Sequence, residues 1–461
     1  MKKSSKRNII ITSLAAIAAA GAVVVGSTYA LFTSESKTNI AVTAGKVSVV
    51  ATLDDLKTYS GAELTGDAAT DSVEPTAEAG VFTNGGTAKI ENNELVLDKM
   101  TPGDKVEFDI KVANNSDVAV QYRTIIKTTE DNGLFSGLKV SIGEEVFYGF
   151  TSVSKLEALA VNSAEETIHV VIELPSDAGN EYQGKSTKIS YAVEAYQGNA
   201  SIEEAEDNEL CLYNAFDLIT FAKLTNTKGW TEAPLKDYTT FTLMDDVDLE
   251  GVKWTPIVFD SNDERVFDGN YKTISNLTVD TLDKDVGMFS YSTGNIIKNV
   301  KLDKAYVKGV NRVAAIAGHA MCAKISNCEV TNSKIVAATW WDPAENQGKG
   351  GYNDGDKAGA FAGYLSGEPN ASVTGCKVEN TVIEGYRDVG SLVGIANASN
   401  PVVKDNSAKD VTIINHRAHN YKNYQTDDEY HVNQDVGEKS STATVMDNTI
   451  ENVTISVSKD E

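Results

Sequence analysis

Aliphatic and turn-forming residues recur in a fixed order along the second half of the chain. Six segments carry an aliphatic residue, any residue, then Asn, Gly or Asp, and three positions later a small or aliphatic residue. They are ISNLTV, IKNVKL, ISNCEV, VTGCKV, VKDNSA and VMDNTI, beginning at Ile274, Ile297, Ile325, Val373, Val403 and Val445. In most repeats a further Asn or Asp follows, at Asp303, Asn332, Asn380, Asp410 and Asn452. Such self-similarity indicates a solenoid, in which each repeat is one coil and buries its apolar edge by stacking.

The residue types within each repeat predict the kind of coil. The alternating apolar positions suit strands, and Asn, Gly or Asp at a fixed offset suits a corner with turn-prone or left-handed backbone. We therefore expect residues 208–461 to form a right-handed parallel β-helix. At its start, residues 208–226 have apolar side chains at helical spacing, namely Leu212, Phe216, Ile219, Phe221 and Leu224. A helix here would cap the open end of the solenoid, where strand edges need a cover.

The first half of the chain alternates apolar and polar residues over short runs separated by turns. Examples are residues 46–53, 105–114, 118–127, 167–174 and 186–197. Frequent strands without helical periods predict an antiparallel β-sandwich over residues 31–200. Residues 54–96 are richer in Gly, Ala, Thr, Asp and Glu, so we expect a long surface insertion there. Residues 201–207 would form an acidic linker to the second domain.

The N-terminus has the pattern of an export signal. Four basic residues precede the apolar run 9–25, and Thr28 and Ala30 place small residues at the −3 and −1 positions of a cleavage site before Leu31. The alternative is an uncleaved membrane anchor, because the apolar run approaches spanning length. No second apolar segment of that length follows. We expect cleavage and export of the mature chain.

The first 200 residues resemble the TasA/camelysin-type biofilm matrix proteins of Gram-positive bacteria. The resemblance rests on the signal segment ending GSTYA, on LFTSESKTNIAVTAGKVSV after it, on residues 97–123 with the Pro102-Gly103-Asp104 turn, and on KISYAVEAYQGN at 188–199. It implies a jelly-roll sandwich, a dedicated signal peptidase, and fibres in which the freed N-terminal segment, such as residues 31–42, adds as a strand to a neighbouring subunit. An exposed sheet edge can accept such a strand. The alternatives are a flexible terminus or an ordinary edge strand.

Camelysin-type proteins have been called metalloproteases, and this sequence gives that activity no support. No H-E-x-x-H motif occurs, and the only histidine of the first domain, His169, lies inside an apolar strand. It is better explained as a core or surface histidine whose hydrogen bonds are satisfied.

The second half resembles the GLUG-motif proteins of bacterial surfaces, which are adhesin-like. The matching segments are DVGMFSY, RVAAIAGH, KAGAFAGY and DVGSLVGI, beginning at 285, 312, 357 and 388, which alternate with the I-x-N repeats. Close approach of neighbouring coils explains the glycines. No strand-loop-helix unit with Gly-x-Gly-x-x-Gly is present, so nucleotide binding is not indicated.

Two insertions interrupt the repeat spacing, whose intervals are 23, 28, 48, 30 and 42 residues. We expect loops at about 338–357 and 416–435, leaving one corner of the helix after Ile335 and Ile413, two coils apart. Coils stack about 4.8 Å apart, so the loops would lie side by side. Their aromatic and histidine residues are Trp340, Trp341, Tyr352, Tyr421, Tyr424, Tyr430, His416, His419 and His431. Such aromatics suit sugar stacking or a protein partner, or simply pack the loops onto the coil.

The same loops hold weak candidates for metal ligands. Asp354 and Asp356 with Asp342, or Asp427, Asp428 and Glu429, could bind calcium, but their spacing fits no calcium-loop signature. The separation of His416 and His419 is unspecific for zinc. We therefore expect no required cofactor.

The net charge bears on the class of binding partner, and the cysteine content bears on the class of scaffold. The formal charge is −25, and −29 once the four basic signal residues are removed, so binding to nucleic acid is not expected. The cysteines, Cys211, Cys322, Cys328 and Cys376, are too few for a disulfide scaffold. Cys328 and Cys376 occupy the same repeat position, which leaves open whether they are buried thiols or a disulfide.

Together these features predict a non-enzymatic, secreted matrix or surface adhesion protein of a Gram-positive bacterium. Its partners would be the signal peptidase, further copies of itself, and a matrix, glycan, host or cell-surface component. The alternatives are a soluble polysaccharide-binding module, or a polysaccharide lyase or hydrolase on the β-helix. An enzyme would need an Asp/Glu cluster, or Lys/Arg with calcium. The repeat strands carry no such cluster, so the two inserts would have to supply it.

Overall fold

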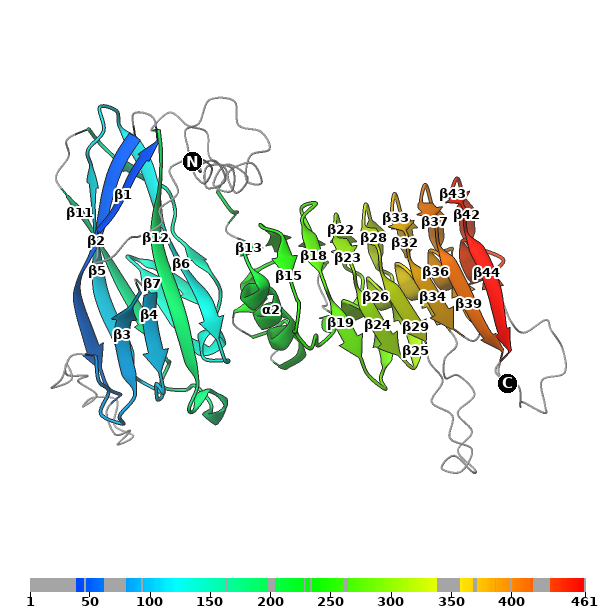
Figure 1. The fold of residues 1–461 in the computed structure, drawn as a ribbon, viewed down its shortest axis with the longest axis horizontal. Coiled ribbons are helices and arrows are strands. Elements are labelled where there is room, and N and C mark those ends of the chain that lie inside the picture. Colours follow the sequence, from blue (N-terminus) through cyan, green and yellow to red (C-terminus); the bar gives the residue numbers. More distant parts are fainter. Residues whose placement is uncertain are drawn as a thin grey trace, which may run out of the picture. The chain divides into compact units, whose positions relative to one another are not determined.

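The computed structural model describes most of the chain and divides it into two compact units, Met1–Glu204 and Ala205–Glu461 (Figure 1). The described residues are 39–44, 47–61, 80–92, 94–161, 165–197, 204–206, 208–227, 229–232, 234–260, 264–337, 357–367, 371–385, 387–397, 400–417 and 432–459. Strands dominate both units, and α2 (Ala215–Thr227) is the single α-helix of these residues. The prediction of an all-β fold is confirmed at this level. No helix among these residues is long and apolar enough to cross a membrane.

The first unit consists of two antiparallel sheets. One has the order β1 (Asn39–Ala44), β2 (Val47–Tyr59), β5 (Lys105–Asn114), β11 (Glu166–Glu173), β7 (Lys139–Ile142) and β8 (Glu145–Tyr148). The other has the order β10 (Glu157–Leu159), β6 (Val120–Asp131), β12 (Ser186–Gln197), β4 (Glu94–Asp98) and β3 (Thr87–Glu91), with β9 (Ser152–Val153) beside β6. Short 3-10 turns occur at Phe135–Gly137 and Asn180–Tyr182.

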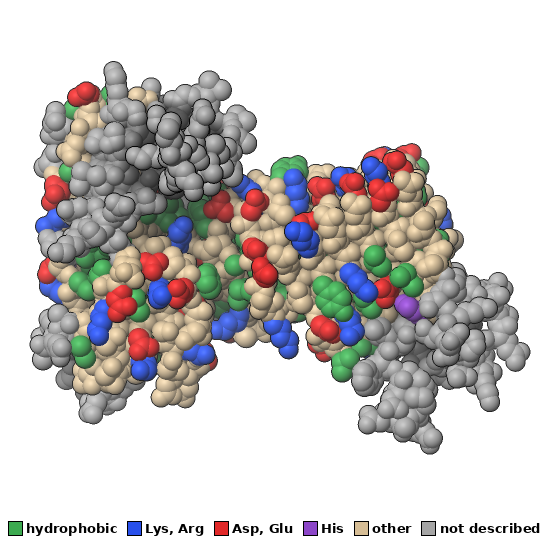
Figure 2. Space-filling view, viewed as in Figure 1, with side chains coloured by type: hydrophobic (Ala, Val, Ile, Leu, Met, Phe, Trp, Pro, Cys, Tyr) green, Lys and Arg blue, Asp and Glu red, His purple; other side chains and the backbone are tan. Residues whose placement is uncertain are grey.

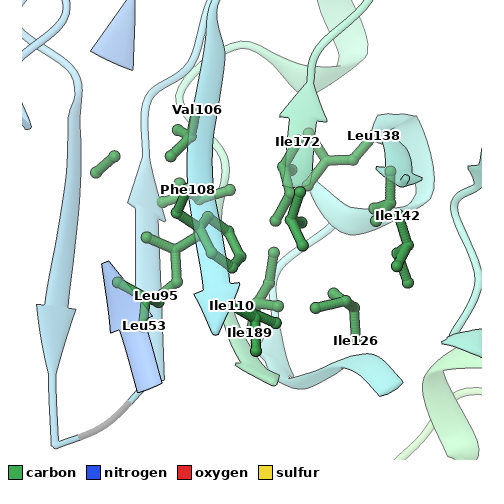
Figure 3. Close-up of a cluster of buried hydrophobic side chains, with 14 of the residues drawn as sticks. Leu53, Leu95, Val106, Phe108, Ile110, Ile126, Leu138, Ile142, Ile172 and Ile189 are labelled. Atoms are coloured by element: carbon green, nitrogen blue, oxygen red, sulfur yellow. The ribbon is translucent and has the colours of Figure 1, made fainter. Parts of the chain in front are cut away.

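Strict alternation of apolar and polar residues places the core between these sheets. In β5 every second side chain is buried, including Phe108 and Ile110. They share one apolar cluster with Leu95, Ile126 and Ile189 of the other sheet (Figure 3). Two antiparallel sheets on a common core agree with the predicted sandwich; the jelly-roll connectivity stays a prediction.

The stretch 54–96 is not the continuous surface insertion expected from its composition. Strand β2 continues to Tyr59, and the β3–β4 hairpin extends the second sheet. Leu95 and Leu97 of β4 are fully buried, because the alternating sequence ELVLD directs both leucines into the core. Within this stretch, residues 62–79 and 93 lie outside the described residues.

The Pro102-Gly103-Asp104 turn is held by its own aspartate. Gly103 has a φ of +91°, which favours glycine. The buried Asp104 carboxylate accepts hydrogen bonds from the backbone amides of Gly61 (2.9 Å) and Thr101 (2.7 Å). The turn therefore ties the strand ends around it together.

The second unit is a stack of coils built from five parallel sheets, which we call the first to fifth stacks in the order the chain visits them in each coil. The first is β13 (Glu209–Leu212), β14 (Thr240–Leu243), β17 (Val266–Asp268), β22 (Ile296–Lys298), β27 (Lys324–Ser326), β32 (Ser372–Thr374), β37 (Val402–Lys404) and β42 (Thr444–Met446). The second is β15 (Val247–Asp248), β18 (Thr273–Ser275), β23 (Lys301–Asp303), β28 (Glu329–Thr331), β33 (Lys377–Glu379), β38 (Ser407–Lys409) and β43 (Thr449–Glu451).

The remaining three stacks complete each coil. The third is β19 (Thr278–Asp280), β24 (Tyr306–Gly309), β29 (Lys334–Ala337), β34 (Val382–Gly385), β39 (Thr412–Arg417) and β44 (Thr454–Lys459). The fourth is β20 (Lys284–Val286), β25 (Asn311–Ala314), β30 (Lys357–Gly359), β35 (Asp388–Gly390) and β40 (Val432–Asn433). The fifth is β16 (Ile257–Asp260), β21 (Phe289–Thr293), β26 (Ala317–Met321), β31 (Ala362–Ser366), β36 (Val393–Ala396) and β41 (Val436–Lys439). These parallel stacks confirm the predicted β-helical architecture.

Left-handed residues turn the corners of each coil, as predicted. The third position of all six repeat segments has a φ between 53° and 64°; these residues are Asn276, Asn299, Asn327, Gly375, Asp405 and Asp447. Asn and Asp tolerate this region better than other residues with a side chain, and Gly adopts it freely. The choice of residue at this offset therefore follows from the backbone that the corner requires.

The first repeat was assigned to the wrong corner. Ile274 lies in the second stack opposite Leu302, and the residue in register with Ile297 is Phe267. The pattern misleads because every coil has a second left-handed corner, formed by Asn276, Lys304, Asn332, Asn380, Asp410 and Asn452. An I-x-N segment therefore fits either corner. In the coil that contains Ile297, the left-handed residue of the second corner is Lys304 and not Asp303.

Close approach between the fourth and fifth stacks explains the glycines of the GLUG-like segments. A Cβ atom on Gly363 would lie 2.4 Å from the carbonyl carbon of Arg312, and one on Gly318 would lie 2.2 Å from the amide nitrogen of Val286. In the first coil Ser290 stands opposite Gly318, between the pairs Phe289–Ala317 and Tyr291–His319. In later coils, the glycine lies against the fourth-stack strand of the preceding coil. Among the described strands the fourth stack begins at β20, so no such strand lies against Ser290 and its side chain fits.

Helix α2 lies at the N-terminal end of the stack (Figure 1). Its Phe221 side chain contacts Phe241 and Phe267 of the first two coils, with ring centroids 4.7 and 5.8 Å away. The Asn214 side chain accepts a hydrogen bond from the Asp217 amide at the helix start. Leu212, which was grouped with the helix by spacing, belongs to strand β13 instead.

Candidate functional site

The predicted cleavage site, Thr28, Ala30 and Leu31, lies outside the described residues. Of the segment 31–42, residues 39–42 belong to β1, which pairs antiparallel with β2. Strand β1 forms an edge of its sheet and pairs only with β2 among the described strands. This part of the segment is thus an edge strand of its own sheet.

The two long connections both leave the third stack and return to the fourth. The first joins β29 to β30 across residues 338–356, and the second joins β39 to β40 across residues 418–431. Because β29 pairs with β34 and β34 with β39, the two connections start two coils apart, as the repeat spacing predicts. We call this the insertion corner.

The insertions are shorter than expected, and most predicted site residues lie outside the described part of the chain. Lys357 begins β30, and His416 and Arg417 continue β39, because in-register pairing with β44 extends that strand. Residues 432–435 are described as well. The undescribed candidates are Trp340, Trp341, Asp342, Tyr352, Asp354, Asp356, His419, Tyr421, Tyr424, Asp427, Asp428, Glu429, Tyr430 and His431.

A carboxylate of the intervening coil joins the stems of the two insertions. Glu384 of β34 forms a salt bridge with Lys334 of β29, 2.7 Å between Nζ and Oε1. Its other oxygen lies 3.4 Å from Nε2 of His416 in β39. The Glu384 side chain is largely buried, so these contacts are better shielded than an exposed ion pair. The stems of both insertions are therefore held to one side chain.

The return side of the insertion corner has a second ionic cluster. Asp388 stands in register with Lys357, which directly follows the first insertion. The fully buried Asp388 carboxylate lies 3.8 Å from Lys357 Nζ and 3.5 Å from Arg387 Nε. Two cations beside one buried anion fix the returning strands, because an uncompensated buried charge would be costly.

Sequence reasoning missed a row of rings on the outer side of the fifth stack. Tyr291, His319 and Tyr364 stand in register on consecutive coils. The His319 ring stacks on Tyr364 at a centroid distance of 4.7 Å and meets Tyr291 edge-on at 4.9 Å. The sequence does contain a signal for this row, because each of the three residues directly follows the Ser or Gly of its GLUG-like segment. Because one face of the Tyr364 ring is already covered, this row offers a sugar less stacking surface than open rings would.

His319 is held neutral within this row. Burial, and then the charge of Arg312, lower its pKa to about 4. Its Nε2 lies 2.8 Å from the Ser366 hydroxyl. Arg312 is paired with Asp285, with Nη2 donating to Oδ2 at 2.6 Å. Burial raises the pKa of Asp285, and Arg312 opposes that shift. These contacts are structural in character, since each polar group is matched by a neighbour.

The outer positions of the first two stacks carry opposite charges on neighbouring coils. Lys377 Nζ lies 3.3 Å from Glu329 of the preceding coil, and Lys298 lies 3.0 Å from Asp268; Lys377 also lies 2.8 Å from Glu379 of its own strand. Figure 2 likewise shows acidic and basic side chains interspersed along the visible face of the second unit. Such alternation is typical of a solvated face and forms no platform of one sign.

The described residues of the first unit offer little chemistry. His169 of β11 is exposed, and its Nδ1 lies 2.9 Å from Asp109 Oδ1, which agrees with a surface histidine whose hydrogen bond is satisfied. Across both units, no group of three or more His, Cys, Asp or Glu among the described residues could hold a metal ion.

No protein-family model matches the chain, and no curated protein matches it. Among solved structures, one described as a "putative immunoglobulin A1 protease" from Bacteroides ovatus is similar, with 13% identity and a TM-score of 0.36. The match covers 55% of this chain and 68% of that one. At this TM-score the similarity supports no inference about function.

Proposed function

We propose that the chain is a secreted, non-enzymatic matrix or surface adhesion protein whose second unit presents the two insertions as its binding region. The observation that carries this proposal is the insertion corner. Two long segments leave one corner two coils apart, and Glu384 joins their stems. A rigid scaffold that places variable loops side by side is the usual arrangement of a binding surface.

Export and assembly complete the proposal. The N-terminal signal pattern supports cleavage before Leu31, and the TasA/camelysin-like sequence supports a jelly-roll domain that joins fibres. Edge strand β1 suits exchange, because an edge strand contributes one row of hydrogen bonds that the same segment of a neighbouring copy could equally supply. In the fibre, residues 31–44 of one subunit would replace β1 beside β2 of the next.

The binding proposal is tested by shortening the insertions to a connection that the fold already contains. The intervening coil joins β34 to β35 through residues 386–387 alone. Replacing 338–356 and 418–431 by this dipeptide should keep the solenoid folded and abolish binding to a glycan array of bacterial and host polysaccharides. Versions with each insertion scrambled in order are the matched controls for loop length, and should also lose binding. Equal binding by shortened and intact proteins would place the ligand elsewhere.

Assembly is tested by electron microscopy of two purified chains. One begins at Leu31, and the other retains a few residues before it. Fibres from the first and single particles from the second are expected, because extra residues obstruct entry of the strand into the neighbouring sheet. Single particles from both would refute strand exchange while leaving the binding proposal standing.

A further inference from the structure

Two cysteines on neighbouring coils occupy the same corner. Cys328 follows left-handed Asn327 between β27 and β28, and Cys376 follows left-handed Gly375 between β32 and β33. The flanking strands pair in register, Ser326 with Thr374 and Glu329 with Lys377. The two cysteines therefore stand directly opposite each other across one coil spacing.

In the structure both are free thiols, buried at the same corner. Cys328 and Cys376 are each 1% exposed. Burial and a hydrogen bond with the Cys376 thiol raise the pKa of Cys328. Each sulfur also lies 3.4 Å from a carbonyl oxygen two residues earlier, Ser326 or Thr374. Neighbouring parallel strands are about 4.8 Å apart, which lies within the Cα separations that disulfides span.

We propose that Cys328 and Cys376 form a disulfide in the exported protein, so that a covalent bond joins two neighbouring coils of the β-helix. In this step both S–H bonds break and one Sγ–Sγ bond forms. The two electrons and two protons pass to an oxidising disulfide, either of an oxidoreductase or of a small molecule, which is thereby reduced to two thiols. The inference rests on the proposed export, because such bonds persist in oxidising compartments.

The finished fold determines when this bond can form. Both thiols are buried and the Cys328 pKa is raised, so little thiolate exists to attack a disulfide once the coils have closed. Oxidation therefore takes place while the coils are assembling. Afterwards the same burial protects the bond from reductants.

The bond would enclose the first insertion. Residues 338–356 lie between Cys328 and Cys376 in the chain, so the disulfide closes a covalent ring around this segment. A cut within the insertion would leave the coils on either side covalently joined. The bond thus links the coils that precede and follow a proposed binding loop, so that a cut in the loop by an extracellular protease would leave the two coils covalently joined.

Peptide mapping tests the proposal directly. The full chain is secreted into an oxidising compartment with a heterologous signal peptide, then denatured in an alkylating reagent without reductant and digested with trypsin. We expect peptide 325–334 joined to peptide 358–377, lighter by two hydrogen atoms than the sum of the two and separated by reduction. Cys211 and Cys322 are internal controls, because no other cysteine stands in register with them. Both should be alkylated, and Cys328→Ser should expose Cys376 to alkylation.

A second measurement covers the case in which Cys328→Ser folds poorly. A specific protease site substituted within residues 344–350 of the otherwise unaltered chain should give one band on a non-reducing gel after cleavage and two bands on a reducing gel. Two bands under both conditions, or alkylation of both cysteines without reductant, would overturn the proposal. So would pairing of either cysteine with Cys211, Cys322 or a second molecule. Because a heterologous signal forces export, these outcomes do not depend on whether the proposed binding function holds.

Discussion

Gly363 offers a direct test of why glycine recurs in the GLUG-like segments. A Cβ atom at this position would lie 2.4, 2.5 and 2.7 Å from three backbone atoms of Arg312 and Val313. Backbone atoms cannot rotate away as the end of a side chain can. Restoring an ordinary contact of 3.4 Å would require these atoms to move apart by about 1 Å, a fifth of the roughly 4.8 Å coil spacing.

The cost of Gly363→Ala follows from what that movement disrupts. The backbone hydrogen bonds between coils run along the same direction; examples are Ala315 N to Ala360 O at 3.0 Å and Phe361 N to Leu392 O at 3.0 Å. Lengthening such a bond by about 1 Å takes it beyond hydrogen-bonding range. Overpacking alone typically costs about 1–3 kcal/mol. With broken hydrogen bonds added, we expect the free energy of unfolding to fall by about 3 kcal/mol or more.

The chain supplies both a specific probe and a matched control for this measurement. All four tryptophans, at 230, 254, 340 and 341, lie in the second unit, so their fluorescence during urea unfolding reports that unit alone. Ser290→Ala changes the equivalent position of the first coil, where the serine is tolerated, and removes one hydrogen bond to Ile257 O. That loss should cost about 1 kcal/mol or less. A Gly363→Ala protein within about 0.5 kcal/mol of the original, or one no less stable than Ser290→Ala, would refute close coil approach as the reason for the glycine.

Three further predictions concern stability. Phe241→Ala should lower the free energy of unfolding by about 3–5 kcal/mol, measured by urea unfolding, because this fully buried ring fills the contact between α2 and the first coils. As pH falls from 6.5 towards 4, the second unit should lose at most roughly 3 kcal/mol of stability, because His319 takes up a proton in the unfolded state but not in the folded state. His319→Gln should remove this loss. Comparison of the urea midpoints of the two proteins at pH 7.5 and 4.5 measures it. Asn332→Ala should lower the free energy of unfolding by about 1–2 kcal/mol, because it places Ala at a φ of 51°. The Asn332 side chain donates a hydrogen bond to Asp303 and helps to lower the pKa of that carboxyl. The stability that Asp303 contributes, and that is lost as pH falls through the carboxyl range, should therefore be smaller in the variant, as urea unfolding across an acid titration would show.

The sequence predicts best where a single period governs both structure and burial. Strands 105–114 and 186–197 have the predicted bounds, because alternation there is uninterrupted. The corners were also predictable, since few residue types tolerate left-handed backbone. The register of the first coil was not, because both corners of a coil accept the same I-x-N segment and only pairing distinguishes them.

The candidate site was predictable only in its position on the helix. Repeat spacing located the insertion corner, because an extra loop shifts every later repeat without disturbing the pattern around it. Glu384 carries no local signal for its role: it joins Lys334 and His416 only because one coil separates each pair of strands. The placement of Cys328 opposite Cys376 likewise depends on the register of coils that are 48 residues apart in the chain.

The connection between the third and fourth stacks has a consequence for how such a protein can change over generations. In successive coils it consists of residues 281–283, residue 310, residues 338–356, residues 386–387 and residues 418–431, while the paired strands on both sides keep their register. The length of the connection at this corner therefore varies without shifting the register of the coils, although the short connections still contribute single residues to the packing, such as the buried Val310 and Arg387 beside Asp388. Mutation and recombination can therefore change the long loops at this corner without changing the register of the coils. An engineer could use the same property by grafting peptides at the exposed Leu282 of the 281–283 connection, or in place of residues 338–356 and 418–431, at spacings set by the coil.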